Sequence, residues 1–168
     1  MLMLAYYFPP RGGSGVQRSL KFAKYLPYHG FDPVVISVTE DEITETREED
    51  FLGEIPDVSI YRAASGERWI RTLARLKLGP LVSMALRPDA HILWRKSVLR
   101  LAGEVIPKHK CEAIYASVQP WSAAVIGADL KRLHGLPLIV DFRDPWSLST
   151  SQAWPSRSHY RRDCRQEE

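Results

Sequence analysis

Apolar runs and amphipathic segments alternate along the chain. Five short apolar runs predict strands buried within a sheet: residues 2–8, 33–38, 58–61, 113–117 and 138–142. Segments with apolar residues at helical spacing predict helices over residues 16–26, 66–77, 94–106 and 120–133. Strands that alternate with helices imply right-handed crossovers. We therefore expect an α/β fold with a Rossmann-like parallel sheet and helices on both faces.

Prolines and a change of composition mark the expected boundaries. We expect Pro27 to end the first helix, Pro107 to end the third, and Pro120 to stand in the first turn of the fourth. After residue 146 the apolar periodicity stops, and Ser and Arg dominate. The sequence thus predicts one domain over residues 1–146, followed over residues 147–168 by a polar tail or a truncated connection to a further domain.

Charge and cysteine content narrow the setting. The net charge is +3, but residues 40–54 hold eight acidic residues and one basic residue, so the rest of the domain is strongly basic. The two cysteines, Cys111 and Cys164, match no metal or redox spacing, which favours free thiols in a reducing compartment. Residues 1–8 do not resemble a signal peptide. We expect a cytoplasmic protein.

Three polar segments follow predicted strands. They are residues 12–18, 117–120 and 141–146. The carboxyl ends of parallel strands share one edge of a sheet, and ligands of such folds bind at that edge. We expect the three segments to form one rim.

The glycine-rich segment before the first helix suggests an anion site. Backbone N–H groups at a helix start cradle phosphate or carboxylate groups, and Arg11 or Arg18 would supply a counter-charge. The alternative is a tight turn in which the glycines serve only backbone geometry. The segment lacks the Gly-Lys-Ser/Thr of a Walker A loop. It is also no clean dinucleotide fingerprint, because Arg18 replaces the third glycine, although Glu40 or Asp41 would suit a ribose.

Three blocks of the sequence carry a resemblance to a known family. Residues 6–18 (YYFPPRGGSGVQR), 116–122 (ASVQPWS) and 140–146 (VDFRDPW) resemble, in this order, the amino-terminal domain of bacterial family 4 glycosyltransferases. These are retaining enzymes of GT-B architecture. The resemblance implies transfer of a sugar from a nucleotide-sugar donor to an envelope saccharide or lipid-linked acceptor, as in polysaccharide biosynthesis, with no metal or other cofactor. It also implies that this chain alone is inactive, because a second domain supplies most of the donor site.

The resemblance assigns roles to residues of each block. Donor phosphate or sugar binding falls to Gly12, Gly13, Ser14, Gly15 and Arg18, the reaction centre to Asp141, Arg143 and Asp144, and acceptor binding to Ser117, Gln119 and Trp146. A structural alternative stays open for each group. An Arg–Asp ion pair would hold the turn after the last strand, and Ser117 and Gln119 would cap a helix. A rival function is a stand-alone Rossmann-like module that binds a nucleotide or another anion without catalysis.

Basic residues recur along the predicted second helix. Arg68, Arg71 and Arg75 occupy one face of it, close to Trp69. They suit an anionic membrane surface, with the protein peripheral on its inner face. The alternative is an amphipathic helix that packs on the sheet and leaves its basic face in water. Nucleic acid is not an expected partner, because no recognition motif accompanies the charge.

Overall fold

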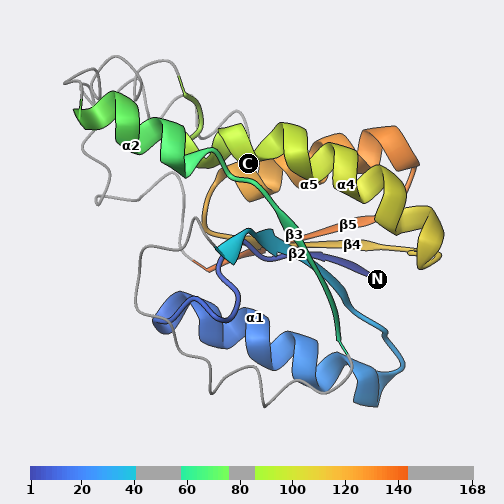
Figure 1. Cartoon of the computed structure of the whole chain (residues 1–168). Coiled ribbons are helices and arrows are strands. Elements are labelled where there is room, and N and C mark those ends of the chain that lie inside the picture. Colours follow the sequence, from blue (N-terminus) through green and yellow to red (C-terminus); the bar gives the residue numbers. More distant parts are fainter. Residues whose placement is uncertain (41–57, 76–85, 144–168) are drawn as a thin grey trace.

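A five-stranded, all-parallel sheet forms the centre of the molecule. The computed structural model describes residues 1–40, 58–75 and 86–143. The strands are β1 (Leu2–Leu4), β2 (Val34–Val38), β3 (Ser59–Ala63), β4 (Ile114–Val118) and β5 (Leu138–Phe142), in the spatial order β3-β2-β1-β4-β5 (Figure 1). This arrangement confirms the predicted Rossmann-like α/β fold.

The helices lie on both faces of the sheet. Helix α1 (Ser14–Tyr25) covers one face, and α4 (Trp94–Lys108) and α5 (Ser122–His134) cover the other (Figure 1). Right-handed crossovers require this division, because the chain moves in one direction from β1 to β3 and in the opposite direction from β3 to β5. The shorter helices are η1 (Leu26–His29), α2 (Glu67–Arg75) and η4 (Ala90–Leu93). No helix in the described ranges is both long and apolar enough to cross a membrane.

The core has a layer on each side of the sheet. Leu2 and Leu4 of β1 face α4 and α5, where they join Trp94 and Val98 in one buried cluster. Met3, between them, points to the other side and belongs to the smaller cluster next to α1. This alternation is the two-residue period of a strand. All residues of β2 and β4 are buried, as expected of strands with a helix layer on each face.

Two strand predictions were partly wrong. The apolar run 2–8 pairs as a strand only over Leu2–Leu4, although Tyr6 and Phe8 further along it are fully buried. Strand β5 was expected to be buried, but it is the last strand of the described sheet, and Ile139 and Phe142 are 54% and 41% exposed. The run 2–8 was therefore buried without being a strand along its whole length. The run 138–142 was a strand without being fully buried.

The prolines act close to their predicted places. Pro27 lies in η1, immediately after α1, and Gly30 ends that turn with a left-handed φ of 79°. The prediction that Pro107 ends its helix was wrong. Helix α4 continues to Lys108, because proline has a helical φ and His109 N still donates to Val105 O. Pro120 precedes α5, which begins at Ser122. Most of the acidic segment 40–54 and all of residues 147–168 lie outside the described residues.

Candidate functional site

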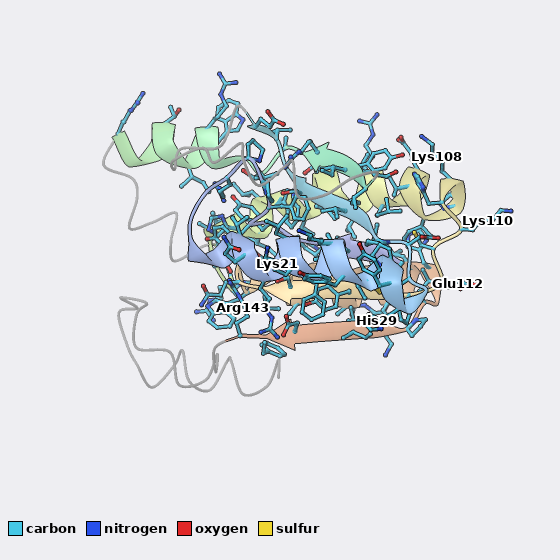
Figure 2. All side chains as sticks on the ribbon, turned by 90° about the horizontal axis from the view of Figure 1, so that it is seen from below. Lys21, His29, Lys108, Lys110, Glu112 and Arg143 are labelled. Carbon is cyan, nitrogen blue, oxygen red and sulfur yellow. The ribbon has the colours of Figure 1, made fainter. Side chains whose placement is uncertain are left out.

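Arg143 joins the three segments that were predicted to form one rim. It follows β5, and its Nη1 donates to the carbonyl oxygen of Gly15 at 3.1 Å, in the glycine-rich segment after β1. Its Nε donates at 3.2 Å to the carbonyl oxygen of Val118, at the end of β4. Figure 2 shows Arg143 at the end of the sheet opposite to Lys110 and Glu112. One side chain therefore links the segment after β5 to the end of β4 and to the start of α1.

A second connection across the rim is the ion pair between Arg18 and Asp141. The Nε and Nη2 of Arg18 donate to the two carboxylate oxygens of Asp141 at 2.5 and 2.6 Å, and Tyr115 Oη donates to the same carboxylate at 2.5 Å. Burial raises the pKa of Asp141, but the hydrogen bonds from Arg18 and Tyr115 outweigh it and hold this pKa below its usual value. Asp141 is therefore an ionised carboxylate at neutral pH, and its partner is Arg18 of α1 rather than Arg143. The turn that the predicted ion pair would hold, at residues 144–145, lies outside the described residues.

The pKa of the Tyr115 phenol is raised, in spite of the opposite effect of Arg18. Burial is the main cause, and the hydrogen bond to the negatively charged Asp141 adds to it. Tyr115 is accordingly a neutral hydrogen-bond donor, whose proton stays on Oη at all physiological pH values.

The start of α1 combines glycine geometry with an uncapped helix end. Gly13 has a φ of 99°, which side-chain-bearing residues rarely adopt, and it immediately precedes the helix. The first turn contains no acidic residue, and no side chain of the described residues caps it. The guanidinium of Arg11 is buried over the rings of Tyr6 and Tyr7, at 5.0 and 5.2 Å from their centroids. The N–H groups and the buried cation make this end of the helix electropositive.

The start of α5 is already bound to a carboxylate of the protein. Asp89 Oδ2 accepts a hydrogen bond from Ser122 N at 3.0 Å, and Oδ1 accepts from Ser122 Oγ at 2.7 Å and from His91 N at 2.9 Å. These contacts satisfy the positive end of α5 and fix η4 against it. Of the two helices that follow β1 and β4, it is α1 whose start is available to an anionic ligand.

A small cavity of about 170 Å³ adjoins the rim. His91 and Gln119 contribute polar groups to its lining, and Tyr7 and Trp121 contribute aromatic rings. The orientation of His91 is fixed, because its Nδ1 lies 2.9 Å from Tyr6 Oη. Pockets for drug-sized ligands usually measure about 300–1,000 Å³, so this one suits a single ring or a small polar group.

Sequence reasoning missed the contribution of residues 89–91. Asp89 was given no role from the sequence, although an Asp just before a helical pattern is an N-cap signal. No local pattern points to His91, because its partner Tyr6 lies far away in the sequence.

The other predicted site residues have different surroundings. Ser117 is buried, and its Oγ accepts a hydrogen bond from Ser19 Oγ at 3.3 Å, so it binds α1 and caps no helix. Gly12 and Ser14 lie in the glycine-rich segment, but Asp144 and Trp146 lie outside the described residues. On α2, Arg68 and Arg75 are exposed, and the side chain of Arg71 is outside the described part.

Neither a metal centre nor a relative adds to this description. Among the described residues, no three His, Cys, Asp or Glu side chains are grouped so that they could hold a metal ion. Comparisons of the chain with protein-family models, with curated proteins and with solved structures find no match.

Proposed function

We propose that this chain provides the amino-terminal, acceptor-side domain of a retaining glycosyltransferase. The enzyme would move a sugar from a nucleotide-sugar donor to an envelope saccharide or lipid-linked acceptor. The observation that carries the proposal is the pair of hydrogen bonds from Arg143 to Gly15 and Val118. They bring together the three sequence blocks that resemble the family, and they do so at the edge of the sheet where α/β proteins bind ligands.

The donor phosphate would bind at the start of α1. The N–H groups there are directed toward the rim, and Gly13 gives the backbone a conformation that lets a phosphate approach closely. Arg143 adds positive charge, because its guanidinium donates to two neutral carbonyl oxygens. As the bond to the sugar breaks, negative charge grows on the leaving diphosphate. Fixed donors of this kind stabilise that charge without a metal.

The acceptor would occupy the small cavity next to the rim. His91, held by Tyr6, and Gln119 present polar groups that suit sugar hydroxyls. The Arg18–Asp141 pair lies on the β5 side of the glycine-rich segment and keeps Asp141 ionised. In this proposal, Asp141 stabilises the positive charge that develops on the sugar ring, and it does not act as the acid.

Turnover would require a second protein surface that faces the rim. The rim belongs to one sheet, whereas glycosyl transfer needs donor and acceptor aligned and shielded from water. We therefore propose that a separate donor-binding domain completes the site, and that the 168-residue chain alone binds the donor weakly and transfers no sugar.

The test is nucleotide binding by rim variants. Uridine diphosphate and a panel of nucleotide sugars are titrated into wild type, Arg143→Ala, and the control Arg132→Ala, which removes a cation bound to Asp129 in the last turn of α5. Loss of a charge-assisted contact of about 1.5–3 kcal/mol should weaken binding by roughly 10- to 150-fold in Arg143→Ala and leave the control unchanged. Equal affinities would exclude the donor site, and sugar transfer by the chain alone would contradict the need for a second domain.

A further inference from the structure

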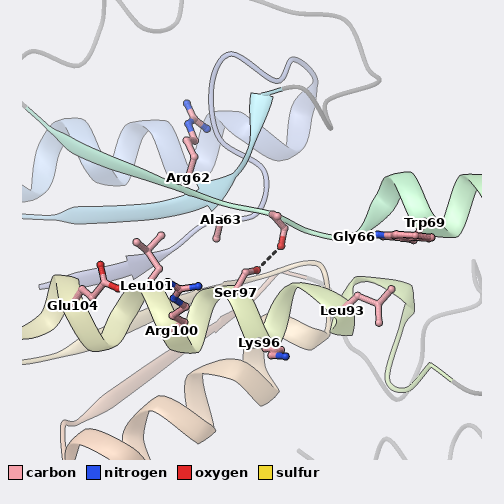
Figure 3. Close-up of a pocket in the computed structure, with 11 residues that line it drawn as sticks. Arg62, Ala63, Gly66, Trp69, Leu93, Lys96, Ser97, Arg100, Leu101 and Glu104 are labelled. Atoms are coloured by element: carbon pink, nitrogen blue, oxygen red, sulfur yellow. Dashed lines mark hydrogen bonds between the residues drawn. The ribbon is translucent and has the colours of Figure 1, made fainter.

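A second, larger cavity lies beyond β3, at the edge of the sheet opposite to β5. Its volume is about 610 Å³, within the range of pockets that hold small-molecule ligands. Its two sides are the link from β3 into α2, with Gly66 and Trp69, and the chain from η4 into α4, with Leu93 and Ser97 (Figure 3). We call it the Trp69 groove.

The Trp69 groove is separate from the rim. The η4–α4 segment runs between the two cavities: Ala90 and His91 line the small one, whereas Leu93 lines the groove. Hydrogen bonds hold the sides of the groove together. Ser97 Oγ donates to the carbonyl oxygen of Ala64 (dashed in Figure 3), and Trp94 Nε1 donates to that of Ala63 at 3.2 Å. These bonds fix the position of α4 against the end of β3.

One part of the groove, where Trp69 and Leu93 face each other across it, exposes apolar surface. Trp69 is 72% exposed, whereas Trp94, which also lies in the basic segment 68–100, is completely buried. Leu93 is 40% exposed. Gly66 has a φ of 77°, and a Cβ added there would lie 3.1 Å from Leu93 Cβ, so the glycine lets the two sides approach closely. An indole left in water beside an apolar wall is suited to stacking with a flat ring.

Among the charged residues that line the groove, the basic ones outnumber the acidic one: Arg62, Lys96 and Arg100 against Glu104. Lys96 and Arg100 are exposed and lie one turn apart on α4. Neither side chain forms a hydrogen bond or an ion pair with any residue that the structure describes. Arg18, Arg95 and Arg132, in contrast, bind carboxylates. Like charges at this spacing repel each other, and an anion between them would remove the repulsion.

We propose that the Trp69 groove binds an organophosphate with a ring-shaped body. The ring stacks on Trp69 beside Leu93, and the phosphate lies between Lys96 and Arg100. Each half of the site contributes what the other lacks: stacking alone would not select an anion, and two exposed cations alone would hold inorganic phosphate only weakly. This site is independent of the proposed glycosyl transfer.

The probe is adenosine monophosphate, compared with adenosine and with inorganic phosphate. Binding is followed by two-dimensional NMR through the Trp69 indole N–H and the Gly66 amide, so that binding at the rim gives separate signals. Adenosine monophosphate should bind at least 10-fold more tightly than either part. Trp69→Ala should weaken it by about 5- to 150-fold, the range of base–aromatic stacking.

Charge reversal separates specific from general attraction. Lys96→Glu and Arg100→Glu should each weaken binding at least 10-fold. The control Lys110→Glu reverses an exposed charge beyond the other end of α4 and should change binding less than 2-fold. Arg143→Ala should have no effect on this groove, which keeps the result independent of the proposed function. Binding no tighter than that of phosphate, or equal losses in Lys96→Glu and Lys110→Glu, would overturn the proposal.

A further titration tests whether the phosphate that binds belongs to a ring-bearing ligand or to a lipid. Short-chain phosphatidic acid, used below its micelle concentration, carries the same anion on acyl chains. Tighter binding than that of adenosine monophosphate, with the same dependence on Lys96 and Arg100 but none on Trp69, would contradict the ring-stacking proposal and assign the groove to a lipid phosphate.

Discussion

The close packing of α5 on the sheet predicts how Gly127→Ala changes the stability of the fold. This glycine is buried in the middle of α5, where the helix crosses β4 and β5. A Cβ added there would lie 3.2 Å from the Cβ of Ala116 on β4 and 2.9 Å from Cδ1 of Leu138 on β5. An alanine in a helix interior is normally more favourable than glycine by about 1 kcal/mol. Here the intrinsic preference and the packing act in opposite directions.

The structure indicates which effect is larger. Leu138 can change rotamer, but the Cβ of Ala116 is fixed to the backbone of a central strand, so the helix itself has to move. Overpacking of this kind costs about 1–3 kcal/mol. After the gain in helix propensity is subtracted, Gly127→Ala should destabilise the fold by about 1 kcal/mol. With an m-value of about 2 kcal/mol/M, the urea midpoint would fall by about 0.5 M.

Gly103 is the matched control. It is exposed on α4, and a Cβ added there would meet no heavy atom within 4 Å. Gly103→Ala should therefore stabilise the fold by about 1 kcal/mol. Urea unfolding of the three proteins, followed by circular dichroism, compares them directly. If Gly127→Ala is as stabilising as Gly103→Ala, the close packing of α5 on β4 is refuted.

Two further predictions concern carboxylates at the rim. Asp89→Ala removes the acceptor for Ser122 and His91 and should lower the free energy of unfolding by about 1–2 kcal/mol, the usual value of a helix cap; an unchanged urea midpoint would contradict this role. Asp141→Asn should be less stable than wild type at pH 7. The pKa of Asp141 is lowered in the folded state, because the bonds from Arg18 and Tyr115 outweigh burial. The difference in the free energy of unfolding between wild type and variant should therefore shrink as the pH falls below about 4. A difference that is independent of pH between 7 and 2 would argue against an ionised Asp141.

The order of elements was predictable because it depends on local patterns. The apolar run 138–142 coincides with β5, and the helix predicted over residues 66–77 was found as α2. What those patterns could not supply was the position of each element in the sheet. An edge strand and a central strand are both apolar when one face is well covered, so the exposure of Ile139 followed only from the order β3-β2-β1-β4-β5.

The site was predictable in outline but not in its contacts. The shared edge of the sheet follows from parallel strands, and it correctly grouped the glycine-rich segment with residues 117–120 and 141–143. The partners did not follow. Arg18 and Asp141 are in contact although they are 123 residues apart in the sequence. Which cation reaches that carboxylate depends on the path of the helices. Similarly, Trp69 and Trp94 belong to one basic, aromatic stretch, yet only the packing of α4 determines that one is exposed and the other is buried.

The sheet order also has a consequence for biosynthesis. Leu2 of β1 pairs with Val34 on one side, but its other neighbour, Ile114, is far along the chain. While the protein is being translated, β1, β2 and β3 can associate early, whereas the second edge of β1 has no partner until β4 has left the ribosome. Such distant pairing slows folding and leaves an apolar edge exposed to other nascent chains. Of the described strands, the central strand β1 is therefore the one whose second edge waits longest for its partner.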